Sequence, residues 1–305
     1  MRERLARRLV INYYMLLHVL HRTQYRYPAT ASESHNEVRL MPLTDDDQRL
    51  SSFELRTTPH ASVYSYQEPG GTVHHFDVRA PHAELVIEME ARIETLRADP
   101  FQNVNLLTED WGRYADPRVR SRFAEYLAPT RLAPHIDEVF RIAEVARKRA
   151  ERPSVASFAV TLNHKLHHLL EYQPGATEVH TPIDRILAQG KGVCQDFAHT
   201  MLAVCRSQGI PSRYVSGYLF GEAGEASNHA EMATHAWVEC LLFGNDGRPL
   251  WRGFDPTNDV AADDKYVKAH VGRDYRDVTP VKGVYRGPAD HTMDVAVVVS
   301  RAAGS

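Results

Sequence analysis

Residues 190–199 consist of the sequence GKGVCQDFAH, in which a loop with two glycines leads to Cys194 and then into an apolar segment. From Phe197 to Cys205 the apolar residues recur at helical spacing, and Gly209 soon ends the pattern. A thiol at a helix N-terminus lies near the positive end of the helix dipole and near unpaired backbone N–H groups, and both favour the reactive thiolate. The sequence therefore predicts a helix that begins at a reactive Cys194.

The composition is that of a globular protein. The chain has 305 residues, of which 43% are hydrophobic and 25% charged, which is enough for one large domain or two of ordinary size. The net charge of −3 provides no basis for binding nucleic acid or an anionic membrane, so we predict neither partner. Of the three cysteines, Cys205 and Cys240 lie in apolar runs that are typical of buried thiols. We therefore expect a reducing, cytoplasmic location.

Four arginines precede an apolar run at residues 9–20, and this arrangement loosely resembles a signal peptide. The run contains polar residues, no small-residue cleavage site follows it, and it is too short to span a membrane. We interpret it as a helical or strand-forming lead-in. Met15 is also an alternative natural start, which would make residues 1–14 an upstream extension.

A β pattern covers residues 15–97. Its first runs are short and are broken by Pro28 and Pro42. Two later runs flank the pair Gly70-Gly71, which suits the positive φ angles of a tight hairpin turn. The clearest strand is 84–94, where apolar and polar residues alternate. Several short strands joined by turns predict an antiparallel sandwich.

The pattern changes near residue 98, where we place a domain boundary. Short helical segments punctuated by prolines lead to Ser154, which we expect to cap a helix with one apolar stripe. Strands are then predicted beyond the cysteine helix, at residues 212–220, 234–243, 251–255 and 293–300.

Three histidines, His164, His167 and His168, share another face of the helix that Ser154 caps. An i, i+4 histidine pair can hold zinc, but the sequence around this pair lacks the glutamate of the zincin motif and shows no third ligand. We therefore predict no metal site and no cofactor.

Nucleophilic thiol catalysis needs a cysteine, a histidine that exchanges its proton, and a polar group that orients the histidine. Cys194 begins a helix, His235 lies near the start of a predicted strand, and Asp255 ends another. Adjacent strands can place such a histidine beside such a carboxylate. His229 is an alternative to His235, and Asp259 is an alternative to Asp255, because spacing alone does not separate them.

Further motifs resemble those of bacterial transglutaminase-like proteins of the cysteine-protease type. The matching segments are YQPGAT (172–177), TP (181–182), GVCQDFAH (192–199), GIPSRYVSGY (209–218), HAWVE (235–239), FDPTN (254–258), GRDY (272–275), DV (277–278) and KGVY (282–285). The resemblance is close over residues 155–300 and looser over residues 18–95, where it involves the family's N-terminal β region.

The resemblance implies an α+β fold. Residues 15–97 are expected to form an N-terminal antiparallel β-sandwich-like domain. Residues 98–305 are expected to form a helical lead-in and a papain-like, transglutaminase-like catalytic core, with helices packed on an antiparallel sheet.

The resemblance also implies a catalytic triad. Within it Cys194 is the nucleophile, His235 the general base and acid, and Asp255 the group that orients His235. The implied activity is hydrolysis of an amide bond in a peptide or protein through an acyl-thioester. The alternatives are a γ-glutamyl transferase that joins glutamine side chains to amines, and a non-catalytic module that binds peptides. No sequence feature separates hydrolase from transferase.

The oxyanion of such a reaction needs two donors, and the backbone N–H of Cys194 is the natural first one. Animal transglutaminases use a tryptophan upstream of the cysteine as the second. No tryptophan lies between Trp111 and Cys194 in this chain, and Tyr172 is the candidate in its place. This departure from the family pattern weighs against crosslinking activity.

Overall fold

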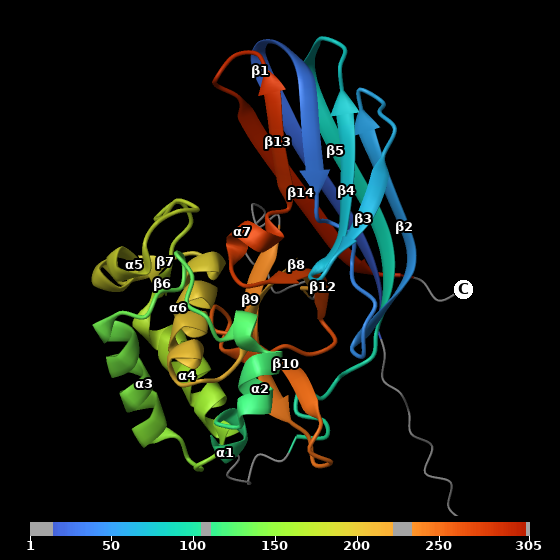
Figure 1. The fold of residues 1–305 in the computed structure, drawn as a ribbon. Helices are drawn as coiled ribbons and strands as arrows, with labels where there is room; N and C mark the ends of the chain where they lie inside the picture. Colours follow the sequence, from blue (N-terminus) through green and yellow to red (C-terminus); the bar gives the residue numbers. More distant parts are fainter. Residues whose placement is uncertain (1–14, 105–110, 222–233, 303–305) are drawn as a thin grey trace, which may run out of the picture.

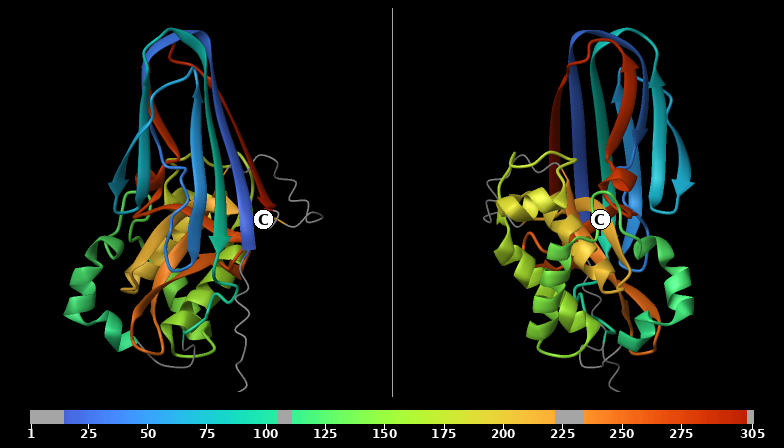
Figure 2. Two further views of the ribbon diagram at one scale, coloured as in Figure 1. Left: turned by 90° about the vertical axis from the view of Figure 1, so that its right-hand side faces the viewer. Right: turned by 60° about the vertical axis from the view of Figure 1, so that its left-hand side comes forward.

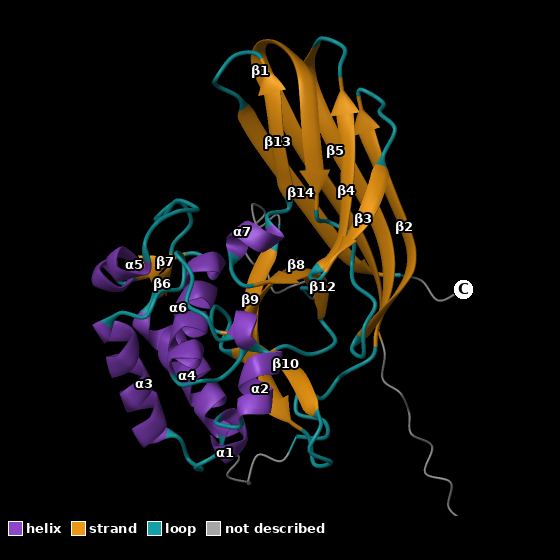
Figure 3. Cartoon of the chain, in the orientation of Figure 1, coloured by secondary structure: helices purple, strands orange, loops and turns teal. Residues whose placement is uncertain are grey.

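A computed structural model describes residues 15–104, 111–221 and 234–302 of the chain. A tall, curled β-sheet stands beside a smaller sheet whose far side is covered by helices (Figures 1 and 2). All of the longer helices lie in the lower part of the molecule, and the upper part consists of strands (Figure 3). None of the helices in these ranges has the length and apolar composition needed to cross a bilayer.

The tall sheet is antiparallel, with the strand order β2-β5-β1-β4-β3, and β13 and β14 also pair with β1. Its strands are β1 (Met15–Val38), β2 (Gln48–Thr58), β3 (Tyr64–Glu68), β4 (Gly71–Val78), β5 (His82–Thr95), β13 (Val281–Arg286) and β14 (Thr292–Arg301).

The strand β1 holds the tall sheet together because two sets of strands share it. Its first half pairs with β5 and β14, and its second half pairs with β4 and β13. The prediction of short runs broken at Pro28 was wrong, since one strand continues through this residue. Proline is tolerated there because the pairing of β1 with β5 shifts register between Arg26 and Ala31, where the ladder is interrupted.

The prediction for residues 84–94 was correct, since they lie within β5 and alternate between buried and exposed positions. The predicted hairpin is also confirmed, with β3 and β4 joined by a turn at Pro69 and Gly70, and Gly71 paired with Glu68. This turn packs against the smaller sheet, where a Cβ on Gly70 would lie 2.0 Å from the carbonyl oxygen of Val271. The N–H of Val271 donates to the carbonyl of Gly70 at 3.0 Å, so glycine allows a close contact between the two sheets.

The smaller sheet is antiparallel, with the order β11-β10-β9-β8-β12. Its strands are β8 (Ser212–Leu219), β9 (His235–Phe243), β10 (Pro249–Asp255), β11 (Val260–Ala261) and β12 (Tyr266–Gly272). The helices are α1 (Trp111–Tyr114), α2 (Pro117–Arg122), the 3₁₀ helix η1 (Ala124–Tyr126), α3 (Asp137–Arg149), α4 (Val155–Leu169), α5 (Ile183–Gln189), α6 (Cys194–Ser207) and α7 (Tyr275–Val278). A two-stranded parallel ladder joins β6 (Glu171–Tyr172) to β7 (Lys191–Gly192).

The helix α6 lies at the centre of the helical layer and begins at Cys194, as predicted. Almost all of its residues are buried, because α6 packs on the strands β8 and β9 and also contacts α3, α4 and α5. The hydroxyl of Ser154 accepts a hydrogen bond from the N–H of Ser157 at 3.1 Å, which confirms the predicted cap of α4. A single apolar cluster joins α3, α4 and α6 to the small sheet.

The opposite side of the small sheet faces the tall sheet, and both apolar and polar contacts join them. Tyr218, Val267 and Ala269 belong to the apolar cluster of the tall sheet. The hydroxyl of Tyr218 donates to the carbonyl of Leu40 at 3.0 Å. The buried ammonium of Lys268 forms ion pairs with carboxylates from both parts of the chain, at 2.9 Å from Asp47 and 3.1 Å from Glu239.

The expected fold class is confirmed, since a curled antiparallel sheet is followed by a mixed helix and sheet core. The three strands predicted directly after the cysteine helix correspond to β8, β9 and β10. The boundary near residue 98 stays a prediction. The strand pairing adds that β13 and β14 return to β1, so the end of the chain completes the N-terminal sheet and does not extend the core sheet.

Candidate active site

Cys194 is the first residue of α6, and the chain before it explains this position. Gly190 ends α5 with a φ of 66°, in the left-handed region that glycine adopts without strain. The strand β7 then pairs with β6, and the N–H of Gln173 donates to the carbonyl of Gly192 at 2.9 Å. The turn and the short ladder thus bring Cys194, half-buried, to the N-terminus of α6.

The carboxylate of Asp196 holds the entry to α6. It accepts a hydrogen bond from the backbone N–H of Val193 at 2.8 Å, and another from the hydroxyl of Thr177. Burial raises the pKa of Asp196, although these two hydrogen bonds act in the opposite direction. A Cβ on Gly192 would lie 2.7 Å from this carboxyl group, so the loop needs glycine there. Asp196 therefore stabilises the first turn of the helix.

His235 and Asp255 come from neighbouring strands of the small sheet. His235 is the first residue of β9, Asp255 is the last residue of β10, and the two strands run antiparallel. The two side chains therefore meet at one edge of the sheet, with Nε2 of His235 2.6 Å from Oδ2 of Asp255. Both side chains are buried, which protects their ion pair from solvent screening.

Asp255 accepts four further hydrogen bonds besides the one with His235. The hydroxyl of Tyr266 and the side-chain amide of Asn258 donate to Oδ2 at 2.8 Å and 2.7 Å. The backbone N–H groups of Thr257 and Asn258 donate to Oδ1 at 2.9 Å and 3.3 Å. The carboxylate is therefore held in one orientation before any substrate binds.

Sequence reasoning did not assign a role to Tyr266 or Asn258. Asn258 belongs to the FDPTN motif, which is a signal that points to it. No comparable signal points to Tyr266, since its strand β12 was not predicted.

The ionisation of the pair follows from these contacts. Burial alone would raise the pKa of Asp255, but His235 and the hydrogen bonds from Tyr266 and Asn258 outweigh it and hold the pKa below its ordinary value. Burial alone would lower the pKa of His235, but Asp255 and then Cys194 outweigh it and raise the pKa to about 10. At neutral pH His235 is therefore an imidazolium paired with a carboxylate.

The other ring nitrogen of His235, Nδ1, does not contact Asp255. Nδ1 is buried and makes no oriented hydrogen bond to the residues that the structure describes. Besides Asp255, Cys194 contributes to the raised pKa of this imidazole. A protonated imidazole beside a thiol at a helix N-terminus favours the thiolate. The structure thus brings Cys194, His235 and Asp255 together, and their catalytic roles stay predictions.

Aromatic side chains enclose His235. The indole of Trp237 stacks on the imidazole, with ring centroids 6.1 Å apart and an angle of 24° between the planes. Two glycines make room for the indole, because a Cβ on Gly217 or Gly253 would lie 2.6 Å and 3.3 Å from its atoms. Trp237 is therefore a buried wall of the site.

The charge of Cys194 affects the pKa of three tyrosines. Burial raises the pKa of Tyr172 to about 12, the pKa of Tyr214 well above its usual range, and the pKa of Tyr275 above its ordinary value. The charge of Cys194 contributes to each of these three shifts. Tyr172 lies in β6 beside Gly192, which is consistent with its candidacy as a second oxyanion donor. Sequence reasoning singled out the motif that contains Tyr275 but assigned this residue no role.

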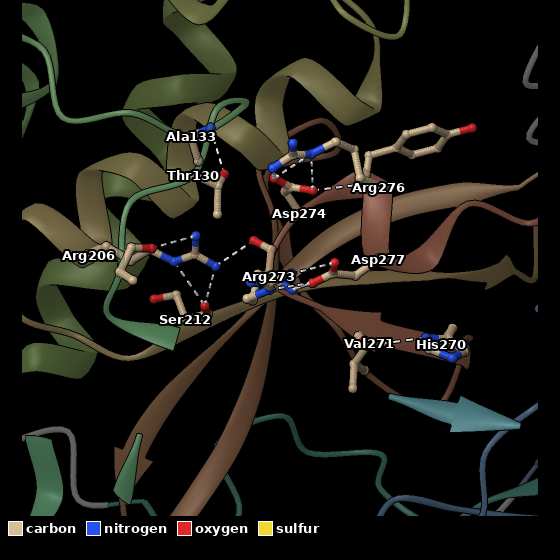
Figure 4. Close-up of polar contacts among 12 residues, drawn as sticks. Thr130, Ala133, Arg206, Ser212, His270, Val271, Arg273, Asp274, Arg276 and Asp277 are labelled. Atoms are coloured by element: carbon tan, nitrogen blue, oxygen red, sulfur yellow. Dashed lines mark hydrogen bonds and ion pairs between the residues drawn. The ribbon is translucent and has the colours of Figure 1, made fainter. Parts of the chain in front are cut away.

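Tyr275 is held at the site by the segment around α7. Its N–H donates to Nε2 of the buried His199 at 3.2 Å, and burial lowers the pKa of His199 to about 3, so this imidazole is a neutral acceptor. The guanidinium of Arg206 donates to the carbonyls of Ser212 at 2.8 Å and Arg273 at 2.6 Å, and thereby fastens the start of α7 to α6 (Figure 4).

The two alternatives from the sequence have different outcomes. His229 lies in residues 222–233, outside the described part of the chain. Asp259 lies beside His164, at 2.6 Å from its Nδ1, while Asp255 contacts His235. In the described ranges, His164, His168 and Asp259 also form a group of side chains with the chemistry to hold a metal ion.

Two family patterns match the chain. That of the transglutaminase-like superfamily matches residues 142–256, and that of the bacterial transglutaminase-like N-terminal region matches residues 17–94. A crystal structure of a "putative cysteine protease" from Cytophaga hutchinsonii has a similar fold, with a TM-score of 0.72 at 20% identity. The alignment covers 96% of this chain and 92% of that one.

Similar sequences occur in bacteria. An uncharacterized protein of Mycobacterium leprae is 38% identical over 290 residues, which are 94% of this chain and 99% of that protein. A protein-glutamine gamma-glutamyltransferase of Pseudomonas aeruginosa is 30% identical over 151 residues, which are 48% of this chain and 21% of that enzyme. With both family patterns matched and the cysteine, histidine and aspartate motifs assembled at one edge of the core, this chain belongs to the transglutaminase-like superfamily.

Proposed function

We propose that this protein is a cysteine-dependent amide-bond hydrolase that acts on a peptide or protein through an acyl-thioester. The observation that supports this proposal best is the contact of His235 Nε2 with Asp255 Oδ2 at 2.6 Å, while Nδ1 has no hydrogen bond among the residues that the structure describes. This arrangement gives the imidazole one orientation and leaves one nitrogen available for proton exchange.

In the acylation step the thiolate of Cys194 attacks the carbonyl carbon of the amide, and the C=O bond becomes a C–O⁻ single bond. The backbone N–H of Cys194 donates to the oxyanion, with Tyr172 as the candidate second donor. When the C–N bond breaks, His235 gives its Nδ1 proton to the leaving nitrogen, so the amine departs neutral and the acyl group stays on Cys194.

In the deacylation step water attacks the thioester carbon. His235, now neutral, accepts a proton from the water, and Asp255 stabilises the imidazolium that forms again. The C–S bond breaks, the acid leaves, and the thiolate–imidazolium pair is restored. Asp255 stays ionised throughout, since its hydrogen bonds and its partner hold its pKa below the ordinary value.

A γ-glutamyl transferase is the second candidate, because a relative with that activity matches 48% of this chain. An amine would then attack the thioester in place of water and give a new amide. The outcome depends on which nucleophile reaches the acyl-enzyme. A non-catalytic peptide-binding module is the third candidate, but it would have no need of a buried pair such as His235 and Asp255.

The test is a screen of peptide and isopeptide substrates with purified full-length protein, with and without an added primary amine. We expect cleavage that the Cys194→Ala variant lacks, and a mass increase on Cys194 when a slow substrate is trapped. An amide product with the amine would favour the transferase. Equal turnover by wild type and Cys194→Ala would overturn the proposal.

Cytoplasmic location is a further proposal. It is based on the three free thiols, two of which, Cys205 and Cys240, are buried with their sulfur atoms 3.6 Å apart.

A further inference from the structure

Three side chains with metal-ligating atoms meet outside the candidate active site. His164 and His168 lie one turn apart on the exposed face of α4, and Asp259 belongs to the turn that follows β10. One ligand atom from each residue lies within 4.8 Å of those of the other two. Sequence reasoning found the histidine pair but no third ligand, because Asp259 is 95 residues away from His164.

The local structure presents these groups to one another. The two imidazole rings have centroids 4.4 Å apart and stand at 82° to each other. Asp259 lies in the turn after β10 and has a φ of 56°, in the left-handed region. Its Oδ2 lies 2.6 Å from Nδ1 of His164, and the side-chain amide of Asn163 donates to its Oδ1 at 3.3 Å. A neighbouring hydrogen bond of this kind orients a carboxylate ligand.

We propose that His164, His168 and Asp259 form a binding site for a divalent transition-metal ion, with Zn²⁺ as the best match. Two imidazole nitrogens and one carboxylate oxygen are typical Zn²⁺ ligands, and water completes a tetrahedron. Ligand atoms around such an ion lie about 3.4 Å apart when each bond is about 2.1 Å long. The exposed histidine side chains can make this small adjustment by rotation.

The surroundings set the expected affinity. Both histidines line a surface hollow of about 210 Å³, and Asp259 lies outside its lining. Two cations, Arg149 and Lys165, also line this hollow and would repel a divalent ion. The ligand set has a single carboxylate, that of Asp259, to offset their charge. The ion takes the place of the proton between His164 and Asp259. We therefore expect micromolar rather than nanomolar binding.

The site is connected to the turn that holds Asp255. Asn258, which donates to Asp255 at 2.7 Å, directly precedes Asp259. The ring of His167 also lies 3.0 Å from the carbonyl of Thr257 in the same turn. A bound ion would bridge α4 and this turn and would stabilise the folded chain by mass action. The binding site does not depend on the proposed hydrolase activity.

The experiment is a calorimetric titration with Zn²⁺ on the full chain carrying Cys194→Ser. This background is needed because a thiol beside an imidazole is itself a zinc ligand. We expect one site, weakened at least about tenfold in His168→Asn and in Asp259→Asn, since each substitution removes a ligand. His168→Asn is the more informative variant, because the exposed His168 has no hydrogen bond among the contacts described.

A matched control is His35→Asn. His35 and Asp77 form another exposed histidine–carboxylate pair, with Nδ1 2.8 Å from Oδ1, on the tall sheet. This control should retain Zn²⁺ binding, and saturating Zn²⁺ should raise its melting temperature by about 2–5 °C. In His168→Asn that rise should be absent. Unchanged binding by His168→Asn, equal loss in His35→Asn, or no binding at all would overturn the proposal.

Discussion

Nε2 of His235 lies 2.6 Å from Oδ2 of Asp255, and both side chains are buried at one edge of the small sheet. The pair raises the pKa of His235 to about 10 and holds the pKa of Asp255 below its ordinary value. A charged pair at the end of two strands, beside a cysteine at a helix N-terminus, is the feature from which the following predictions are derived.

We expect Asp255→Asn to lower kcat/KM for the cleaved substrate by about 10²–10⁴-fold. The imidazolium form of His235 loses its stabilising charge, and the neutral form loses the partner that fixes its tautomer. Steady-state kinetics on a peptide substrate measures this effect, with circular dichroism to check the fold. Asp246→Asn is the control, since that exposed carboxylate lies at a hairpin turn far from the triad. Similar kinetics for Asp255→Asn and wild type would contradict the role of Asp255.

Tyr266→Phe should lower kcat about threefold to tenfold and the free energy of unfolding by about 1–2 kcal/mol, because one hydrogen bond to a buried carboxylate is lost. Tyr218→Phe is a matched control. It removes a tyrosine hydroxyl from the same sheet, where that hydroxyl donates to the carbonyl of Leu40 and does not touch Asp255. We expect the control to lose stability but keep its kcat. A parallel loss of kcat in both variants would mean that Tyr266 acts only through stability.

Stability should decrease at alkaline pH. The pKa of His235 is raised in the folded state, from 6.5 to about 10, so its contribution is fully present below pH 6.5 and is lost as the pH rises through about 10. The loss should be of the order of a few kcal/mol. Urea unfolding between pH 6 and pH 10.5 measures it. The decrease should be smaller in His235→Asn, and an identical pH dependence in both proteins would exclude this ion pair as its cause.

Gly192→Ala should reduce both stability and activity. The new Cβ would lie 2.7 Å from the carboxyl group of Asp196, which holds the entry to α6, so the loop before Cys194 must shift. We expect a loss of about 1–3 kcal/mol in the free energy of unfolding, measured by denaturant titration. Gly112→Ala is the control, because a Cβ at that position meets no atom within 4 Å. Wild-type behaviour of Gly192→Ala would show that the loop tolerates the shift.

Iodoacetamide at neutral pH should label Cys194 well before the other two cysteines. Cys194 is half-buried at a helix N-terminus and interacts with a protonated imidazole, whereas Cys205 and Cys240 are fully buried. Peptide mapping by mass spectrometry gives the rate for each thiol. His235→Asn should slow the labelling of Cys194. Equal rates for all three thiols in the folded protein would count against an activated nucleophile.

Much of the small sheet could be predicted because its signals are local. The helix that begins at Cys194 follows from apolar spacing, and β8, β9 and β10 follow from alternating residues between turns. The motifs around His235 and Asp255 likewise lie within a few residues of each side chain. Local patterns of this kind do not depend on how distant segments pack.

The tertiary structure was needed wherever a position depends on residues far apart in the chain. The continuous β1 depends on partners from both ends of the chain, and its passage through Pro28 depends on a register shift in that pairing. Tyr266 contacts Asp255 only because of how the chain folds between β10 and β12. The meeting of His164 with Asp259 is set by the packing of α4 against the turn after β10.

The sequence was therefore sufficient to single out Cys194, His235 and Asp255 as candidate site residues and to predict the fold class, because helix starts, strand alternation and short motifs are encoded within about ten residues of each position. Only the tertiary structure revealed which groups hold Asp255, which tyrosines are affected by the charge of Cys194, and which carboxylate joins the histidines of α4. These contacts arise from the packing of separate elements, and no local pattern in the chain records it.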